Sequence, residues 1–144
     1  MAIKIVDSLF SKLPKQTAIS KATQAYVTDT VLMEDTTNSY AIPGTSSAST
    51  LTVLGINTKS FTAGSSNGTV NYIPVITGAV FVVADCTNAT AANQLHKNHL
   101  LTDAATINNT STTSTAKEGC FHALALSGST KLYGYFIRSG QVTA

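Results

Sequence analysis

From residue 25 onward, apolar and polar positions follow one another in short runs that predict β-strands. Residues 25–33 (AYVTDTVLM) alternate between two faces, whereas residues 78–85 (GAVFVVAD) are almost wholly apolar, as in a buried central strand. Residues 119–126 and 131–138 flank the sequence SGST, which predicts a hairpin with a four-residue loop. Such runs recur every ten to fifteen residues between Gly, Ser, Thr and Asn. This spacing predicts a mainly β fold, either a small antiparallel barrel or a sandwich.

The first 24 residues have a different pattern. Their apolar residues recur three or four positions apart, the spacing of one face of a short helix that Pro14 would end: Ile3, Val6, Phe10 and Leu13. A helix this short is marginal in water and needs a surface to pack against, either its own domain or a partner. We therefore expect an N-terminal arm over residues 1–24, short-helical or extended, and a β-rich body domain over residues 25–144.

The composition changes this picture in one respect, which is the scarcity of charge. Hydrophobic residues make up 43% of the chain, but charged residues only 11%, against about a quarter in an average domain. A surface of hydroxyls and amides suits a protein that packs beside many copies of a neighbour, where like charges would repel. The net charge of +2 divides into +3 in residues 1–24 and −1 in the rest. The body has no basic stripe, so we expect no nucleic-acid binding.

The sequence also bears on where the protein is made. No apolar run reaches the roughly 18–20 residues of a membrane span, so we expect no membrane partner. Asp7 interrupts the N-terminal segment, which has no long apolar core of a secretory signal. We therefore expect synthesis in a cytoplasm and two free cysteines rather than a disulfide.

Four potential metal ligands raise the question of a zinc enzyme: Cys86, His96, His99 and Cys120. Their spacing fits neither a zinc finger nor His-Glu-x-x-His. His96 and His99 would share a helix face but point apart on a strand. We expect no metal and no cofactor, with buried cysteines and surface histidines. Convergence of the four residues into the site of a hydrolase or metalloenzyme stays open as an alternative.

Other catalytic patterns are missing from the sequence. It contains no G-x-S-x-G nucleophile elbow and no Gly-rich phosphate loop before a helix. Of the seven carboxylates, only Glu34 and Asp35 are adjacent, and adjacent residues of a strand point to opposite faces. The sequence therefore predicts that the protein is not an enzyme.

The order of features over residues 25–138 resembles a known group. The strand AYVTDTVLM, the segment YAIPGTSSASTLTVLGI, the strand TGAVFVVADCTNATAANQ and the hairpin GCFHALALSGSTKLYGYFIR follow one another. This order resembles the small β-rich decoration, or cement, proteins on the heads of tailed bacteriophages. These pair a strand like GAVFVVAD with a later hairpin, a pattern fitted here by Gly119, Ala125, Leu126, Tyr133 and Phe136. The resemblance implies a virion protein that binds the outer surface of the capsid without catalysis.

Two binding hypotheses follow. In the first, the body sits on the capsid and the arm reaches the major capsid protein, reinforcing contacts between capsid subunits, with further copies of the chain around a symmetry axis. The arm residues that would then be buried are Ile3, Ile5, Val6, Leu9, Phe10 and Leu13. In the second, the body is a receptor- or glycan-binding module of a virion surface. Tyr133 and Tyr135, two apart on one strand face, are the candidate stacking residues.

Overall fold

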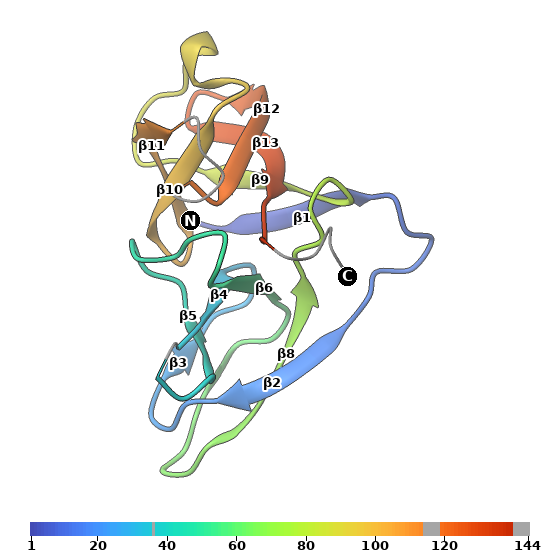
Figure 1. Ribbon diagram of the computed structural model, residues 1–144, viewed down its shortest axis with the longest axis vertical. Coiled ribbons are helices and arrows are strands. Elements are labelled where there is room, and N and C mark those ends of the chain that lie inside the picture. The colour runs from blue at the N-terminus through green and yellow to red at the C-terminus, as the bar shows by residue number, and fades with distance from the viewer. Residues whose placement is uncertain (36, 114–118, 140–144) are drawn as a thin grey trace.

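The computed structural model describes residues 1–35, 37–113 and 119–139, and its regular structure is almost entirely β (Figure 1). This confirms the predicted mainly β fold. A single 3₁₀ turn, η1 (Ala92–Gln94), interrupts the strands in these ranges. The strands are β1 (Ile3–Ser8), β2 (Gln16–Ser20), β3 (Ala25–Tyr26), β4 (Val31–Glu34), β5 (Ala41–Pro43), β6 (Val53–Asn57), β7 (Phe61–Thr62), β8 (Gly68–Pro74), β9 (Val80–Asp85), β10 (Asn98–Asp103), β11 (Thr106–Thr113), β12 (Phe121–Gly128) and β13 (Lys131–Phe136).

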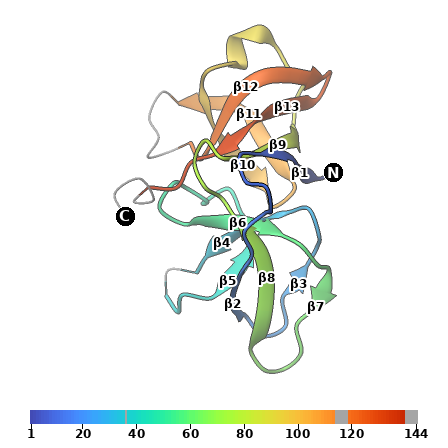
Figure 2. The ribbon, with the colours of Figure 1, turned by 90° about the vertical axis from the view of Figure 1, so that its right-hand side faces the viewer.

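The strands form two lobes. Six make one sheet in the order β1-β9-β13-β12-β10-β11, and five close a barrel in the order β2-β5-β4-β6-β8, while β3 pairs with β7. Figures 1 and 2 show the sheet above the barrel. Because β1 belongs to the sheet and β2 to β8 follow it below, the barrel is inserted between the first strand of the sheet and the rest.

The N-terminal segment forms strands, and the helix predicted for it is not found. Strand β1 pairs antiparallel with β9, placing Ile3 opposite Ala84, and β2 pairs antiparallel with β8. Of the two expected conformations, the extended one is present. Residues 1–24 thus contribute to both lobes rather than forming an arm beside a body that begins at residue 25. The physical reason is that β1 covers an edge of β9 and buries Ile3 completely.

One hydrophobic core joins the two lobes. It contains residues of the sheet, including Ile3, Phe121 and Leu132, and residues of the barrel, including Val31 and Val53, all of them fully buried. A smaller core fills the barrel below it. Its buried members are Tyr26, Leu32, Ala41, Ala63, Val70 and Tyr72.

Polar contacts also connect the lobes. The Val31 N–H donates to the Ala104 carbonyl at 2.7 Å, and the Ile3 N–H donates to the Asp29 carbonyl at 2.8 Å. After β13, the Arg138 guanidinium donates to the Val53 carbonyl and lies 3.5 Å from the Glu34 carboxylate. Because these contacts run from different strands, the lobes are held in one arrangement.

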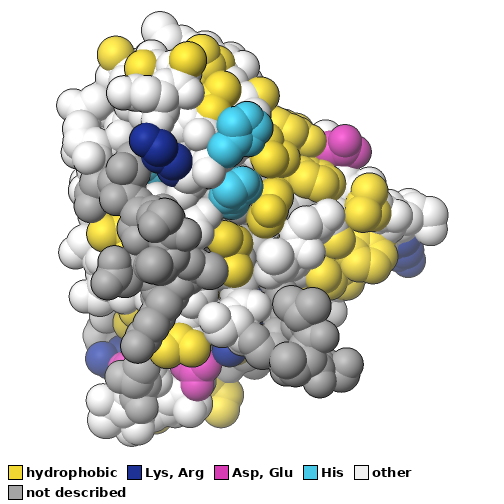
Figure 3. Space-filling view, turned by 45° about the horizontal axis from the view of Figure 1, so that its top comes forward, with side chains coloured by type: hydrophobic (Ala, Val, Ile, Leu, Met, Phe, Trp, Pro, Cys, Tyr) yellow, Lys and Arg dark blue, Asp and Glu magenta, His cyan; other side chains and the backbone are white. Residues whose placement is uncertain are grey.

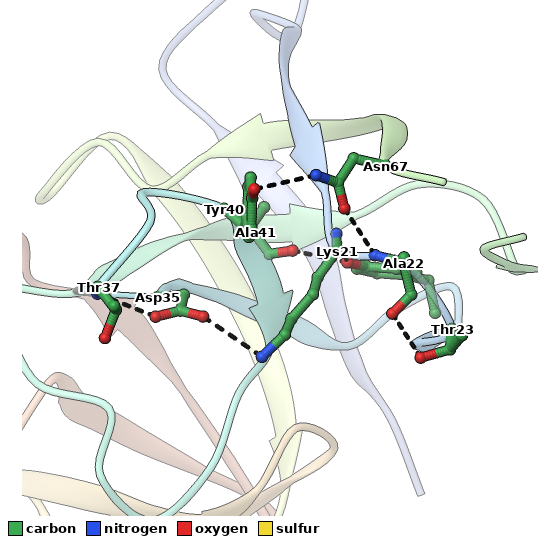
Figure 4. Close-up of polar contacts among 9 residues, drawn as sticks. Lys21, Ala22, Thr23, Asp35, Thr37, Tyr40, Ala41 and Asn67 are labelled. Carbon is green, nitrogen blue, oxygen red and sulfur yellow. Dashed lines mark hydrogen bonds and ion pairs between the residues drawn. The ribbon is translucent and has the colours of Figure 1, made fainter. Parts of the chain in front are cut away.

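Polar contacts link side chains and backbone groups of the turns at one end of the barrel (Figure 4). The Asn67 amide donates to the Tyr40 hydroxyl at 2.9 Å, and its carbonyl oxygen accepts the Ala22 N–H at 3.0 Å. Lys21 lies 3.5 Å from the Asp35 carboxylate. Asn67 thereby connects its own turn with the segments that contain Ala22 and Tyr40.

Two further sequence predictions have different outcomes. The 119–138 hairpin is confirmed, but its turn has two residues rather than the predicted four, because β12 continues to Gly128, which pairs with Lys131. The strand predicted over residues 25–33 is broken into β3 and β4. The break falls before β4, where Asp29 adopts a positive φ of 59°, a conformation that Asp tolerates better than most residues.

We expect Gly55→Ala to destabilise the barrel. A Cβ at this position would lie 2.2 Å from the Ile73 carbonyl oxygen and 2.5 Å from the Tyr72 ring, so the backbone or the ring must move. The free energy of unfolding should fall by about 1–3 kcal/mol or more, measured by urea denaturation. Gly64→Ala is the matched control, because nothing lies within 4 Å of its Cβ. Equal stability of the two variants would contradict this packing.

Candidate interaction surface

The two cysteines are structural. Cys86 and Cys120 are buried and unbridged, as predicted. Burial raises the pKa of Cys86 to about 11 and that of Cys120 to about 12, so both thiols stay protonated at neutral pH. Within the described parts of the chain, no group of three or more His, Cys, Asp or Glu residues could hold a metal ion. The four candidate ligands do not converge on such a site.

His99 corrects the expectation of a surface histidine, since its side chain is fully buried. It lies on β10, two positions before the buried Leu101, and shares the inward face with it. Its Nε2 is 2.8 Å from the Gln94 carbonyl oxygen. A carbonyl only accepts, so Nε2 carries the proton, and the buried Nδ1 has no hydrogen-bond partner. Burial lowers the pKa of His99, against an opposing effect of the Gln94 hydrogen bond.

His122 lies on β12, opposite Asn98 of β10, and its side chain is partly exposed. Its Nδ1 is 2.7 Å from the Asn98 amide oxygen, and its ring centroid is 5.3 Å from that of Tyr135. Burial, together with the nearby His96, lowers the pKa of His122. His96 is exposed, as predicted. The imidazole of His122 therefore begins a row of rings on the outside of the sheet.

The outward side of β1, β9 and β13, together with His122 of the neighbouring β12, forms a surface that we call the outer face. Its residues follow from the strand register: Tyr133 lies opposite Val83, which lies opposite Lys4, and Lys131 lies opposite Asp85. All of these side chains are at least partly exposed, whereas those of Val82 and Ala84 point into the core. Strand β9 is thus central in the sheet, as predicted, but its outward residues Phe81 and Val83 are apolar and only half-buried.

Aromatic rings occupy the middle of the outer face. Phe81 stacks on Tyr133 with ring centroids 5.8 Å apart and meets Tyr135 edge-to-face at 6.1 Å. With His122 on Tyr135, four rings follow one another across three strands. Figure 3 shows apolar side chains gathered beside histidines and extending toward the projecting edge of the molecule. Tyr133 and Tyr135 are therefore together and accessible, as a binding role would require.

A shallow cleft of about 480 Å³ lies at one end of the outer face. The residues lining it are Met1, Ala2, Lys4, Val6, Val83, Asp85 and Lys131. The Asp85 carboxylate accepts a hydrogen bond from Lys131 Nζ at 2.5 Å and another from the Ala2 N–H at 2.8 Å. Although burial opposes ionisation, these two donors hold the pKa of Asp85 below its ordinary value. The cleft therefore combines an apolar floor with fixed charges.

The loop between β1 and β2 (residues 9–15, the β1–β2 loop) lies at the other end and projects from the molecule (Figure 1). Leu9 is 75% exposed and Phe10 is 41% exposed. The Leu9 N–H donates to the Ala79 carbonyl at 2.8 Å. The Ser8 hydroxyl accepts the Phe10 N–H at 3.2 Å and donates to the Phe10 carbonyl at 3.0 Å. These bonds shape the start of the loop before any partner binds.

The structure divides the six residues predicted to contact a partner. Ile3 belongs to the core and Ile5 packs against it, so neither is available. Val6 is 54% exposed beside a register shift in β1. Leu9 and Phe10 are exposed, and Leu13 is half-buried. The available apolar contacts are therefore confined to Val6 and the β1–β2 loop.

Sequence reasoning missed several residues of the outer face, namely Lys4, Phe81, Val83, Asp85, His122 and Lys131. The almost wholly apolar run over residues 78–85 was a signal that could have indicated Phe81 and Val83. In an apolar strand, either both faces are buried or one exposes apolar side chains. The sequence alone does not distinguish these cases, because it does not show what covers the second face.

Comparisons with known proteins give no further information about this surface. No family model, no curated protein and no solved structure matches the chain. Among the described residues, no helix is long and apolar enough to cross a membrane.

We expect the protein to lose stability in mild acid because of His99. Its pKa is lowered from 6.5 in the folded state, so the unfolded chain binds the proton first as the pH falls. The free energy of unfolding should decrease from about pH 7 to about pH 5. Urea denaturation across this range should show a smaller decrease for His99→Gln, with the contribution of His122 remaining. An unchanged pH dependence in the variant would contradict this assignment.

Proposed function

We propose that this protein is a virion structural protein that binds the outer surface of a tailed-phage capsid and reinforces contacts between capsid subunits. The observation that carries the proposal is the β1–β2 loop, which presents Leu9 and Phe10 together to solvent on a projecting edge. Apolar side chains in this position leave water only when a partner covers them. The partner that we propose is the major capsid protein.

The energetics suit a contact that is repeated many times. Full burial of Leu9 or Phe10 would contribute up to about 1.5–3 kcal/mol each. Because hydrogen bonds to Ala79 and Ser8 already hold the start of the loop, little ordering opposes this gain. A single contact of this size is weak. Copies of the chain associated around a capsid symmetry axis would bind with avidity, since each further contact forms within one assembly.

The remaining surface supports the same role. Charged residues make up only 11% of the chain, so neighbouring copies meet little repulsion. The contacts between the lobes allow the sheet and the barrel to bridge neighbouring subunits as one piece. The proposal assigns no catalytic role to the protein and places it on the capsid surface after synthesis in the host cytoplasm.

The paired substitution of Leu9 and Phe10 by Ser tests the loop. Co-sedimentation with empty heads of the cognate phage should show an affinity at least about tenfold lower than that of the wild type, because the burial of both side chains is lost. Leu51→Ser is the matched control, since Leu51 is 59% exposed on a different loop. Full occupancy by the double variant would refute the role of the loop. Wild-type protein that stays in the supernatant would refute the function.

A further inference from the structure

We propose that the outer face is a second binding site, for an acidic oligosaccharide that lies in the cleft and continues along the aromatic rings. This inference does not rest on capsid binding, because it uses different residues from those of the β1–β2 loop. Three features carry it: the shape of the cleft, the row of rings beside it and the excess of positive charge among the residues that line the cleft, which do not include Asp7, the carboxylate opposite Phe81.

The cleft has the size and lining of a small-ligand site. Its volume of about 480 Å³ falls within the roughly 300–1,000 Å³ of ligand pockets. Val6 and Val83 supply apolar surface, and Asp85 and Lys131 supply polar groups at its edge. It is shallow, so a ligand in it keeps many of its own polar groups in water. A sugar, with an apolar face of C–H groups and a rim of hydroxyls, meets these conditions better than a lipid chain.

The aromatic rings extend the cleft in one direction. Tyr133 lies opposite Val83 of the cleft wall, and Phe81 stacks on Tyr133 with a centroid separation of 5.8 Å. Tyr135 and His122 continue the row. The negative faces of such rings attract the weakly positive C–H groups of a pyranose. Tyrosine adds a hydroxyl for the sugar rim, so successive sugar units can be held along the row.

The charge of the cleft selects an acidic sugar. Lys4 and Lys131 both line it, against the single carboxylate of Asp85. Asp85 is already paired with Lys131 at 2.5 Å. Lys4 has no ion-pair partner in the described parts of the chain. The Lys4 ammonium group can therefore bind a carboxylate of the ligand. The side chains of Lys131 and Asp85 can form hydrogen bonds with sugar hydroxyls.

A glycan array tests the ligand class with uronic-acid and sialic-acid oligosaccharides beside the same sugars with their carboxylates methyl-esterified. The wild-type protein should bind the acidic forms and lose binding when they are esterified, because Lys4 then has no anion to meet. The absence of any signal above background would overturn the proposal, and so would equal binding of the two forms.

Calorimetric titration with an acidic oligosaccharide found on the array locates the site. Lys4→Gln should weaken binding about tenfold or more, since it removes a charge-assisted hydrogen bond. Tyr133→Ala should weaken it about tenfold through the lost stacking surface. Lys12→Gln removes the same charge from the β1–β2 loop and should leave affinity within about twofold. An equal loss in Lys4→Gln and Lys12→Gln would show nonspecific attraction and overturn the proposal.

Capsid binding and sugar binding can be tested separately. The Leu9 and Phe10 double variant should keep its sugar affinity, because neither residue lines the cleft. Lys4→Gln should keep its head binding. Loss of head binding in Tyr133→Ala, with no sugar bound by the wild type, would make the outer face part of the capsid contact and overturn the glycan proposal.

Discussion

Strand β1 lies between the two lobes, and the rest of the structure depends on its pairing with β9. Ile3 is fully buried in the core that both lobes share, and its N–H donates to Asp29 of the barrel lobe. On the other side of the strand, Lys4 and Val6 line the cleft. The β1–β2 loop then leaves the end of β1 in a defined direction. One short strand thus joins the lobes, completes the outer face and positions the exposed loop.

Burial on one side of β9 and partial exposure on the other gives the sheet two roles. Val82 and Ala84 contribute to the core, whereas Phe81 and Val83 contribute to the outer face. Partly exposed apolar and aromatic residues next to a few charges are typical of surfaces that bind a partner. Both proposals use this sheet, the capsid proposal at the β1–β2 loop and the glycan proposal at the cleft and rings. Neither requires a reactive group.

The sequence predicts this fold best where local pattern and tertiary structure agree. The apolar run over residues 78–85 contains the central strand β9, and the 119–138 segment forms the expected hairpin, although with a shorter turn. It fails where tertiary contacts decide. The helical spacing of Ile3 and Val6 misleads because β9 offers an edge that only a strand can cover. In the sequence His99 resembles a loop residue. Its strand pairs with β12, which comes later in the chain, so the local sequence does not show that His99 is buried. The outer face is partly predictable, through Tyr133 and Tyr135, but its partners on β1 and β9 depend on register.

The most direct test of this account is equilibrium unfolding of the chain with residues 2–8 deleted. If β1 is part of the core, the deletion exposes the edge of β9 and removes the buried Ile3. Truncating one large core side chain alone costs about 2–5 kcal/mol. The shortened chain should lose its cooperative unfolding transition in urea, or unfold at a far lower urea concentration than the full chain. An unchanged transition midpoint would show that residues 2–8 are a dispensable arm and would contradict it.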